Sequence, residues 1–216
     1  DRFWARSSGV DQAAALGAML NMQTCYGANL THDADAHAAV PHEYGTLILS
    51  RHPIASCGNT LLPRAGAASE QRGLLKAGIR AGAALLDFYD THLHTQEADR
   101  RVQIDAVLRQ LGAQAAPVIL VGDLNARPTE PYIAPLLAVL ADVWAASGSG
   151  PGFTSPASPR APARRRIDYI LVSPDLHTAR AAVLDDGTAA VASDHYPVIA
   201  DVVLPASGRP ISKAVR

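Results

Sequence analysis

Four short polar clusters in the sequence contain side chains that can transfer protons, bind a cation or orient an anion. The clusters are Thr91-His92-Leu93, Gly122-Asp123-Leu124-Asn125, Arg166-Ile167-Asp168 and Ser193-Asp194-His195. Each stands at one end of an apolar segment whose pattern predicts a strand. A side chain that leaves the core at a strand end has a rigid base, and catalytic residues are often found at such positions.

Each cluster also has a structural explanation when it is taken alone. Gly122-Asp123 could be an ordinary turn, His92 a hydrogen-bonded histidine at a strand end, and Ser193-Asp194-His195 the cap of a turn. Asp168 is different, because it lies in an otherwise apolar, alternating strand. Burying a carboxylate is costly without a partner, so a nearby histidine is expected. The four clusters together are hard to explain by structure alone.

The elements that must position these clusters are mostly strands. The apolar runs predict strands at 44–50, 74–79, 83–92, 118–121, 167–172 and 198–204, with a break at Gly82. Several strands follow one another without an intervening helix, which favours stacked sheets with helices outside over a simple doubly wound sheet.

Helices and loops are predicted between the strands. Ser7 and Ser8 are expected to cap a helix that buries Ala13, Leu16 and Leu20. A second helix opens at Thr95, with acidic residues in its first turn, and a third segment covers 130–140. The stretches 31–42 and 147–163 are expected to be loops.

No repeat or linker divides the chain, so we expect one domain over residues 1–205 and a polar tail over 206–216. Of the 216 residues, 48% are hydrophobic and 18% are charged, which is typical of a folded globular chain. The net charge of -1 gives no general attraction to a polyanion, which weighs against a protein that grips long duplex DNA.

Cellular location and cysteine state stay open at this level. No signal peptide or membrane-length apolar run is visible, and the sequence begins at Asp1 rather than at Met. Cys25 and Cys57 lie outside any zinc-like spacing; they could form a disulfide, but two buried thiols are favoured.

Five segments together resemble a known family. YGTLILSRHPI, THLHTQEADRRVQ, VILVGDLNARP, RRIDYILVSP and SDHYPVIADV are similar, in this order, to motifs of the endonuclease/exonuclease/phosphatase family. That family includes pancreatic-type DNases, apurinic endonucleases, inositol polyphosphate 5-phosphatases and bacterial sphingomyelinases. The resemblance covers about residues 6–204 and implies an α/β (α+β) fold, a four-layer α/β/β/α sandwich of two mixed sheets flanked by helices.

The resemblance also implies a role for each matching position. His195 would activate the attacking water or contact the phosphate, and Asp168 would hold its ring and favour its charged form. Asp123 would hold or deprotonate the nucleophilic water. Asn125 would orient the phosphate and stabilise its charge, and His92 would bind a non-bridging phosphate oxygen.

A divalent cation is implied in the same way, with Asp194 among its ligands. Mg²⁺ is expected, with Mn²⁺ as the alternative, because a hard ion prefers carboxylate and water oxygens. The ion would neutralise charge on the phosphate and on the leaving oxygen.

Other basic and histidine-rich segments are less informative. Arg160, Arg164, Arg165 and Arg166 form a basic run for which a solvated loop is the favoured interpretation. The functional alternative is a contact from Arg166 to a substrate phosphate. In the stretch 31–42, the irregular spacing of the histidines at positions 32, 37 and 42 does not predict a metal site.

The family pattern departs at the beginning of the sequence. Two further metal-site residues, an Asn in the first strand and a Glu in a Gln-Glu motif, have no counterpart here. The stretch from Asp1 to Gln12 resembles the segment that normally comes just after that Glu. We therefore expect the chain to lack an N-terminal strand-helix-strand unit, as a fragment would.

Three functions remain open. The first is a metal-dependent phosphoesterase that hydrolyses a phosphomonoester or phosphodiester of a small-molecule or lipid-type substrate. The second is a DNA or RNA nuclease of the same family, and the third is a non-catalytic relative or fragment with an incomplete metal site. The oligomeric state is not predicted.

Overall fold

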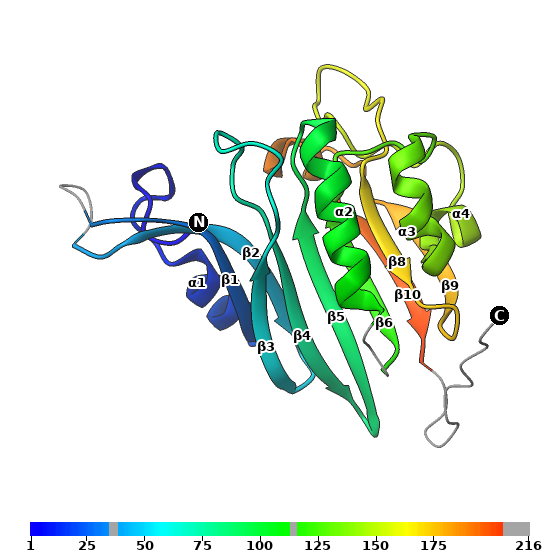
Figure 1. Ribbon diagram of the computed structural model, residues 1–216, viewed down its shortest axis with the longest axis horizontal. Coiled ribbons are helices and arrows are strands. Elements are labelled where there is room, and N and C mark those ends of the chain that lie inside the picture. Colours follow the sequence, from blue (N-terminus) through cyan, green and yellow to red (C-terminus); the bar gives the residue numbers. More distant parts are fainter. Residues whose placement is uncertain (35–38, 113–115, 205–216) are drawn as a thin grey trace.

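A six-stranded mixed sheet forms the centre of the molecule in the computed structural model, which describes residues 1–34, 39–112 and 116–204 (Figure 1). In spatial order its strands are β3 (Ile54–Leu61), β4 (Gly73–Ala81), β5 (Ala84–His92), β6 (Val118–Asp123), β8 (Asp168–Val172) and β7 (Ala141–Asp142). Strands β5 and β6 are parallel, whereas every other neighbouring pair is antiparallel. The carboxyl ends of β5 and β6 and the beginning of β8 therefore meet at one edge of the sheet.

Two antiparallel strand pairs form a second layer. One pair is β1 (Gln23–His32) with β2 (His42–Ser50), and the other is β9 (His177–Val183) with β10 (Val198–Val203). Ile48 of the first pair packs with Leu75 of the central sheet, and Ala200 of the second pair packs with Leu86 and Val172.

Helices cover the outer faces of both layers. The helix α2 (Glu97–Leu111) lies across the other face of the central sheet, beside η2 (Pro131–Ile133) and α3 (Ala134–Val139) (Figure 1). Leu74 packs on this side with Ile104 and Val107, whereas its neighbour Leu75 faces the second layer, as the period of two of a strand requires. The short elements η1 (Ala5–Ser7), α4 (Val143–Ser147) and α5 (Ala189–Ala192) complete the fold. The prediction of stacked sheets with helices outside is confirmed.

The predicted strands are all present, but four others were missed, one of them the two-residue strand β7. Strands β1, β3 and β9 contain many small or polar residues, and most side chains of β3 are exposed. Edge strands with one or two solvent-exposed faces lack the apolar run that reveals a buried strand.

The first helix begins later than predicted and buries a different face. The helix α1 (Gln12–Leu20) is capped by Asp11, whose side chain accepts a hydrogen bond from the Ala14 backbone N–H. Its buried residues are Ala13 and Gly17, whereas the predicted Leu16 and Leu20 are exposed. The reason is close packing on β1, because a Cβ at Gly17 would lie 2.5 Å from the Thr24 methyl carbon.

The predicted loop at 31–42 is shorter than expected, because β1 extends to His32 and β2 starts at His42. Residues 35–38, which include one of its three histidines, lie outside the described residues. Residues 205–216 do so too, and the division into a domain and a tail stays a prediction.

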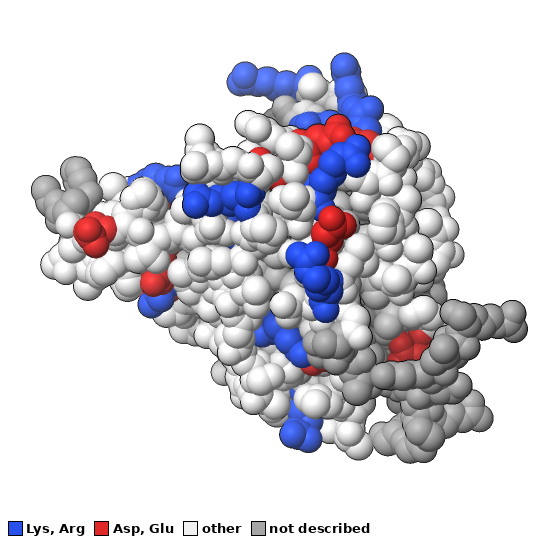
Figure 2. All heavy atoms as spheres, viewed as in Figure 1, with Lys and Arg blue, Asp and Glu red and all other residues white. Residues whose placement is uncertain are grey.

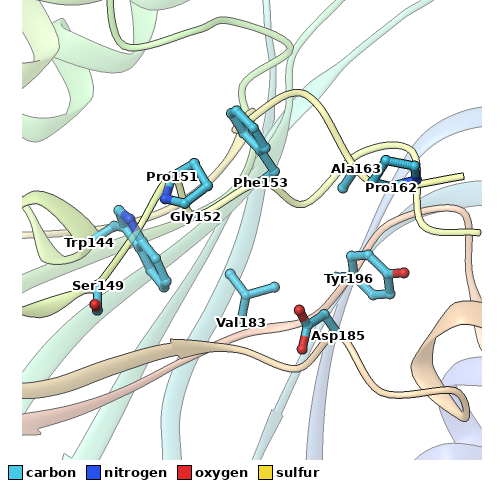
Figure 3. A pocket seen from close by; sticks show the side chains of 10 residues that line it. All are labelled: Trp144, Ser149, Pro151, Gly152, Phe153, Pro162, Ala163, Val183, Asp185 and Tyr196. Atoms are coloured by element: carbon cyan, nitrogen blue, oxygen red, sulfur yellow. The ribbon is translucent and has the colours of Figure 1, made fainter.

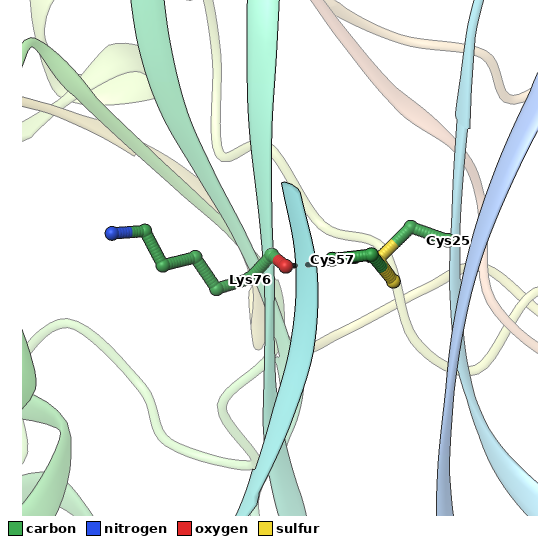
Figure 4. Close-up of a disulfide and its surroundings, with 3 residues drawn as sticks. All are labelled: Cys25, Cys57 and Lys76. Carbon is green, nitrogen blue, oxygen red and sulfur yellow. Dashed lines mark hydrogen bonds between the residues drawn. A yellow bond between two sulfur atoms is a disulfide. The ribbon is translucent and has the colours of Figure 1, made fainter. Parts of the chain in front are cut away.

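The preference for two thiols was wrong: Cys25 and Cys57 form a disulfide that joins β1 to β3 (Figure 4). The two Cα atoms are 5.6 Å apart, within the normal range for a disulfide. Cys25 is buried, with its Sγ 3.6 Å from the carbonyl oxygen of Lys76, whereas Cys57 is exposed. Sequence spacing could not show this contact, because the missed strands β1 and β3 create it.

None of the helices in the described ranges is both long and apolar enough to cross a membrane.

Candidate active site

Three of the predicted site residues lie side by side across three neighbouring strands. His92 is the register partner of Asp123 in the parallel pair β5–β6, and Asp123 is the register partner of Asp168 in the antiparallel pair β6–β8. Neighbouring strands are about 4.8 Å apart, so residues in one row share a face and can interact. The Nε2 atom of His92 lies 3.4 Å from Oδ2 of Asp123.

The last residues of β6 and the turn that follows them hold Asp123 and Asn125. Gly122 has a φ of +138°, and a Cβ there would lie 1.8 Å from the Thr91 carbonyl oxygen, so only glycine fits this position. The Asn125 backbone N–H donates to Oδ1 of Asp123 at 2.7 Å, and Nδ2 of Asn125 donates to the Leu93 carbonyl at 2.9 Å. These bonds fix both side chains at the end of the sheet.

His195 contacts the row of His92, Asp123 and Asp168 through the Asp168 carboxylate. Its Nδ1 lies 3.0 Å from Oδ1 and 2.9 Å from Oδ2 of Asp168. Because an ionised carboxylate can only accept hydrogen bonds, Nδ1 carries the proton and Nε2 is left to face substrate or solvent. The partner expected for the carboxylate of Asp168 is therefore His195.

Two loops clamp this pair in place. The Tyr196 N–H donates to the Thr154 carbonyl at 2.8 Å, and the Ala157 N–H donates to the Asp194 carbonyl at 2.6 Å. The buried Thr154 hydroxyl also donates to Oδ2 of Asp168. The loop at 147–163 is thus partly a structural support for the site.

The site gives its ionisable groups different protonation states. Burial, together with the negative charge of Asp168, raises the pKa of Asp123 to about 6. Burial and the positive charge of Arg72 lower the pKa of His92 to about 4. The hydrogen bond that His195 donates to Asp168 raises the pKa of His195, with smaller contributions from the charges of Asp123 and Asp194. Near neutral pH the site therefore holds a neutral His92, whereas Asp168 favours the charged form of His195 relative to a free imidazole.

The structure places the remaining predicted residues differently. Asp194 is exposed beside His195 and lies outside the tight cluster. Arg166 forms an ion pair with Asp142 at 2.8 Å, with side chains only 10% and 7% exposed, and its guanidinium lies over the Tyr169 ring. This placement favours a structural role for Arg166 over a phosphate contact.

The residues present fit a hard divalent cation. Potential ligand atoms of Asp123, Asp168 and His195 lie within 4.8 Å of one another, and a cation would compete with the hydrogen bond between the last two residues. A cation there would relieve the repulsion between the two carboxylates. Both Asp168 oxygens already accept hydrogen bonds, so Asp123 Oδ2 and the exposed Asp194 are the carboxylate donors less committed to protein partners.

Two side chains near the site were missed in the sequence. Thr154 lies in a Gly-, Pro- and Ser-rich stretch that gave no sign of a buried contact to Asp168. Arg72 stands just before β4, and its charge acts on both His92 and Asp123. An arginine at the start of a strand is usually a solvated residue, so its type alone gave no signal.

A pocket of about 380 Å³ begins one residue from His195 (Figure 3). Tyr196 forms part of its wall, and Trp144 and Phe153 stand on other sides of the space. Its carboxylate is Asp185, which has no ion pair among the residues that the structure describes. The lining is Trp144, Ser149, Pro151, Gly152, Phe153, Pro162, Ala163, Val183, Asp185 and Tyr196.

The fold is similar to several solved structures. A protein of unknown function from Enterococcus faecalis V583 aligns with a TM-score of 0.73 at 19% identity, over 89% of this chain and 81% of that chain. The mannosyl-6-phosphatase Bt3783 of Bacteroides thetaiotaomicron aligns with a TM-score of 0.65 at 20% identity, over 93% and 94%. D. rerio TDP2, in complex with a single-strand DNA product, aligns with a TM-score of 0.63 at 17% identity, over 88% and 80%. At these identities the likeness concerns the fold alone.

Comparison of the sequence with family models gives one match that covers most of the chain. The model described as "Endonuclease/Exonuclease/phosphatase family" matches residues 3–195, whereas no curated protein matches the chain. Since the matched region covers most of the chain and includes all four polar clusters, the protein belongs to the endonuclease/exonuclease/phosphatase family, whose members are hydrolases that act on phosphoesters.

Proposed function

We propose that this protein is a divalent-metal-dependent phosphoesterase that hydrolyses a phosphomonoester or phosphodiester of a small organic or lipid-type substrate. The observation that carries the proposal is the contact between His195 Nδ1 and both oxygens of Asp168, next to the row of His92 and Asp123. A histidine oriented by a half-buried carboxylate can transfer a proton or contact an anion.

The side chains divide the work of attacking phosphorus. Asp123, ionised above pH 6, holds the nucleophilic water and accepts its proton. Asn125, fixed by the Leu93 carbonyl, orients the phosphate. His195, whose pKa is raised by its hydrogen bond to Asp168, stabilises charge on the phosphoryl oxygens, while the neutral ring of His92 donates to a non-bridging oxygen.

A cation bound at Asp123, with Asp194 nearby, would neutralise negative charge on the phosphate. Mg²⁺ suits these oxygen donors, and Mn²⁺ is the alternative.

The surroundings of the site support a small substrate. Figure 2 shows Lys and Arg interspersed with Asp and Glu, without one continuous basic stripe on the face shown. The pocket beside Tyr196 has aromatic and proline walls that can receive an organic group linked to the phosphate. The mannosyl-6-phosphatase among the similar structures is named for a sugar phosphate, which is a substrate of this size.

A nuclease is the second candidate. Arg160, Arg164 and Arg165 are exposed on the loop that clamps His195, and such arginines can contact backbone phosphates. D. rerio TDP2, which shares the fold, was solved with a single-strand DNA product.

The test is hydrolysis of p-nitrophenyl phosphate and bis-p-nitrophenyl phosphate, with Mg²⁺ or with EDTA. We expect turnover that requires the metal and that Asp168→Asn lowers by about 10²–10⁴-fold, because the amide no longer orients His195. The matched control is Asp201→Asn on β10, whose carboxylate is 70% exposed and pairs with Arg180 at 3.7 Å. Near-normal rates in Asp168→Asn, with a control-like melting temperature, would contradict the proposal.

A further inference from the structure

Arg72 is a buried arginine whose hydrogen-bonding capacity is largely unused. Its side chain is 8% exposed, and Nη2 lies 3.0 Å from Oε1 of Glu70, which is 45% exposed. Within the described part of the chain, Nε and Nη1 are buried and have no hydrogen-bond partner. Buried donors are normally paired, so these two nitrogens point to an acceptor that comes from outside the described residues.

The backbone places Arg72 beside the row of site residues. Leu74 of β4 pairs with Thr91 of β5, and the Thr91 hydroxyl donates to the Gly73 carbonyl at 2.8 Å. Continuing this antiparallel register brings Gly73 opposite His92 and places Arg72 one residue further. Its backbone carbonyl accepts from Leu62 N–H at 2.8 Å, which fixes its position. The influence of its charge on His92 and Asp123 agrees with this placement.

Arg100 and Arg166 also have largely buried side chains, but each lacks either the unpaired donors or the position at the site. The guanidinium of Arg100 bonds the Tyr132 hydroxyl and the His94 and Thr95 carbonyls, so its donors are used. Arg166 also has an unpaired Nη1, but its ion-pair partner is the buried Asp142 and it lies over Tyr169. Arg72 combines unpaired donors with a position at the site.

We propose that Arg72 is a phosphate-binding residue of this site, with the unpaired guanidinium nitrogens donating to oxygens of the phosphoryl group next to His92. The proposal rests on the proposed phosphoesterase function. A guanidinium stays charged at all relevant pH values, whereas His92 is neutral near pH 7. Arg72 therefore supplies the permanent positive charge that His92 cannot supply, and Glu70 holds the guanidinium in place.

The experiment measures binding of inorganic phosphate by ³¹P NMR or calorimetry, together with KM and kcat for p-nitrophenyl phosphate. We expect Arg72→Met to weaken phosphate binding and to raise KM by roughly tenfold or more, since charge-assisted hydrogen bonds are lost. Arg72→Lys should restore part of the affinity, because the charge remains but the fork of donors does not. The control is Arg80→Met at the exposed end of the same strand, which should stay within about twofold of wild type.

The outcomes separate this inference from the proposed function. Unchanged phosphate affinity and KM in a folded Arg72→Met protein overturn the inference and leave the phosphoesterase assignment intact. Weaker phosphate binding in a protein without metal-dependent hydrolysis supports an anion site and overturns the catalytic function. If Arg72→Met does not fold, Arg72→Lys decides, because wild-type affinity and KM in that variant contradict a directed guanidinium contact. A wild-type protein that binds no phosphate at millimolar concentration also overturns the inference.

Discussion

Two aspartates stand next to each other in the row of site residues, and their partners make them different. Asp168 is held by His195 and Thr154, so its oxygens are occupied, which agrees with the proposed role of orienting the imidazole. Asp123 shares one oxygen with the Asn125 N–H and keeps the other near His92. Neighbouring carboxylates in unlike environments separate into an orienting group and a group that can exchange a proton.

The raised pKa of Asp123 predicts the pH dependence of catalysis. An acid with a pKa of about 6 is protonated below that pH, and the protonated form can neither accept a proton from water nor hold a cation, so kcat/KM should fall as the pH drops below 6. Above pH 6 the rate should level off, and the raised pKa of His195 extends this plateau to higher pH. Rates on p-nitrophenyl phosphate between pH 4.5 and 8.5 check this. A profile that stays flat down to pH 5 would assign the base to another group.

At this scale the sequence revealed the residue types and their strand-end positions, but only part of the contacts. His92, Asp123, Asp168 and His195 stood out because each is a polar residue next to an apolar strand. Whether they carry out the proposed roles stays a prediction. Arg72 could not be recognised, since its importance depends on the burial of two nitrogens and on the register of β4 with β5.

At the scale of elements, the site is produced by strand pairing. The parallel pair β5–β6 aligns His92 with Asp123, and the antiparallel β8 adds Asp168 at the next position. Alternation and apolar runs made these central strands predictable. The partly exposed strands β1 and β3 were not predictable, because their polar residues hide the strand pattern. As a result, the disulfide between them could not be predicted either.

Asp90 on strand β5 is another acid with a raised pKa, and its effect on stability depends on pH. Burial raises the pKa of Asp90 from 3.8 to about 7. Since the folded-state pKa is the higher one, this carboxyl favours folding at low pH, and its contribution is lost as pH rises from about 4 to 7. Asp90→Asn should therefore stabilise the protein by roughly 1–3 kcal/mol at pH 8 and change little at pH 4.

Thermal or urea unfolding at both pH values measures the effect. Asp105→Asn, an exposed change on α2, is the matched control and should be neutral at both. Equal effects of Asp90→Asn at pH 4 and pH 8 would show that ionisation of this residue does not matter for folding.

At the scale of the whole molecule, charge is balanced. The chain has 19 Lys and Arg against 20 Asp and Glu, and both signs are mixed over the face shown in Figure 2. A protein without a large single-sign field attracts its substrate by local contacts rather than by long-range steering. The sandwich itself is shared with relatives of several functions. The fold therefore does not identify the substrate, which depends on the site and its loops.

This balance predicts weak salt dependence on small substrates. Raising NaCl from 50 to 200 mM should change kcat/KM for bis-p-nitrophenyl phosphate by less than about threefold, because no large counterion layer is released. Parallel assays on single-stranded and duplex DNA provide the comparison. DNA cleavage that is faster than ester hydrolysis and that falls by 10² or more over the same range would favour the nuclease.

The disulfide between Cys25 and Cys57 also determines whether proteolytic cleavage of the chain can be detected on a denaturing gel. A single protease cut anywhere between these two residues, including the whole of β2, leaves two fragments that are still covalently linked. Such a nicked molecule migrates as one species on a denaturing gel without reductant and separates into two when thiol is added. Limited proteolysis of the β1–β2 hairpin is therefore invisible under oxidising conditions, and an apparently intact preparation has to be examined in both states.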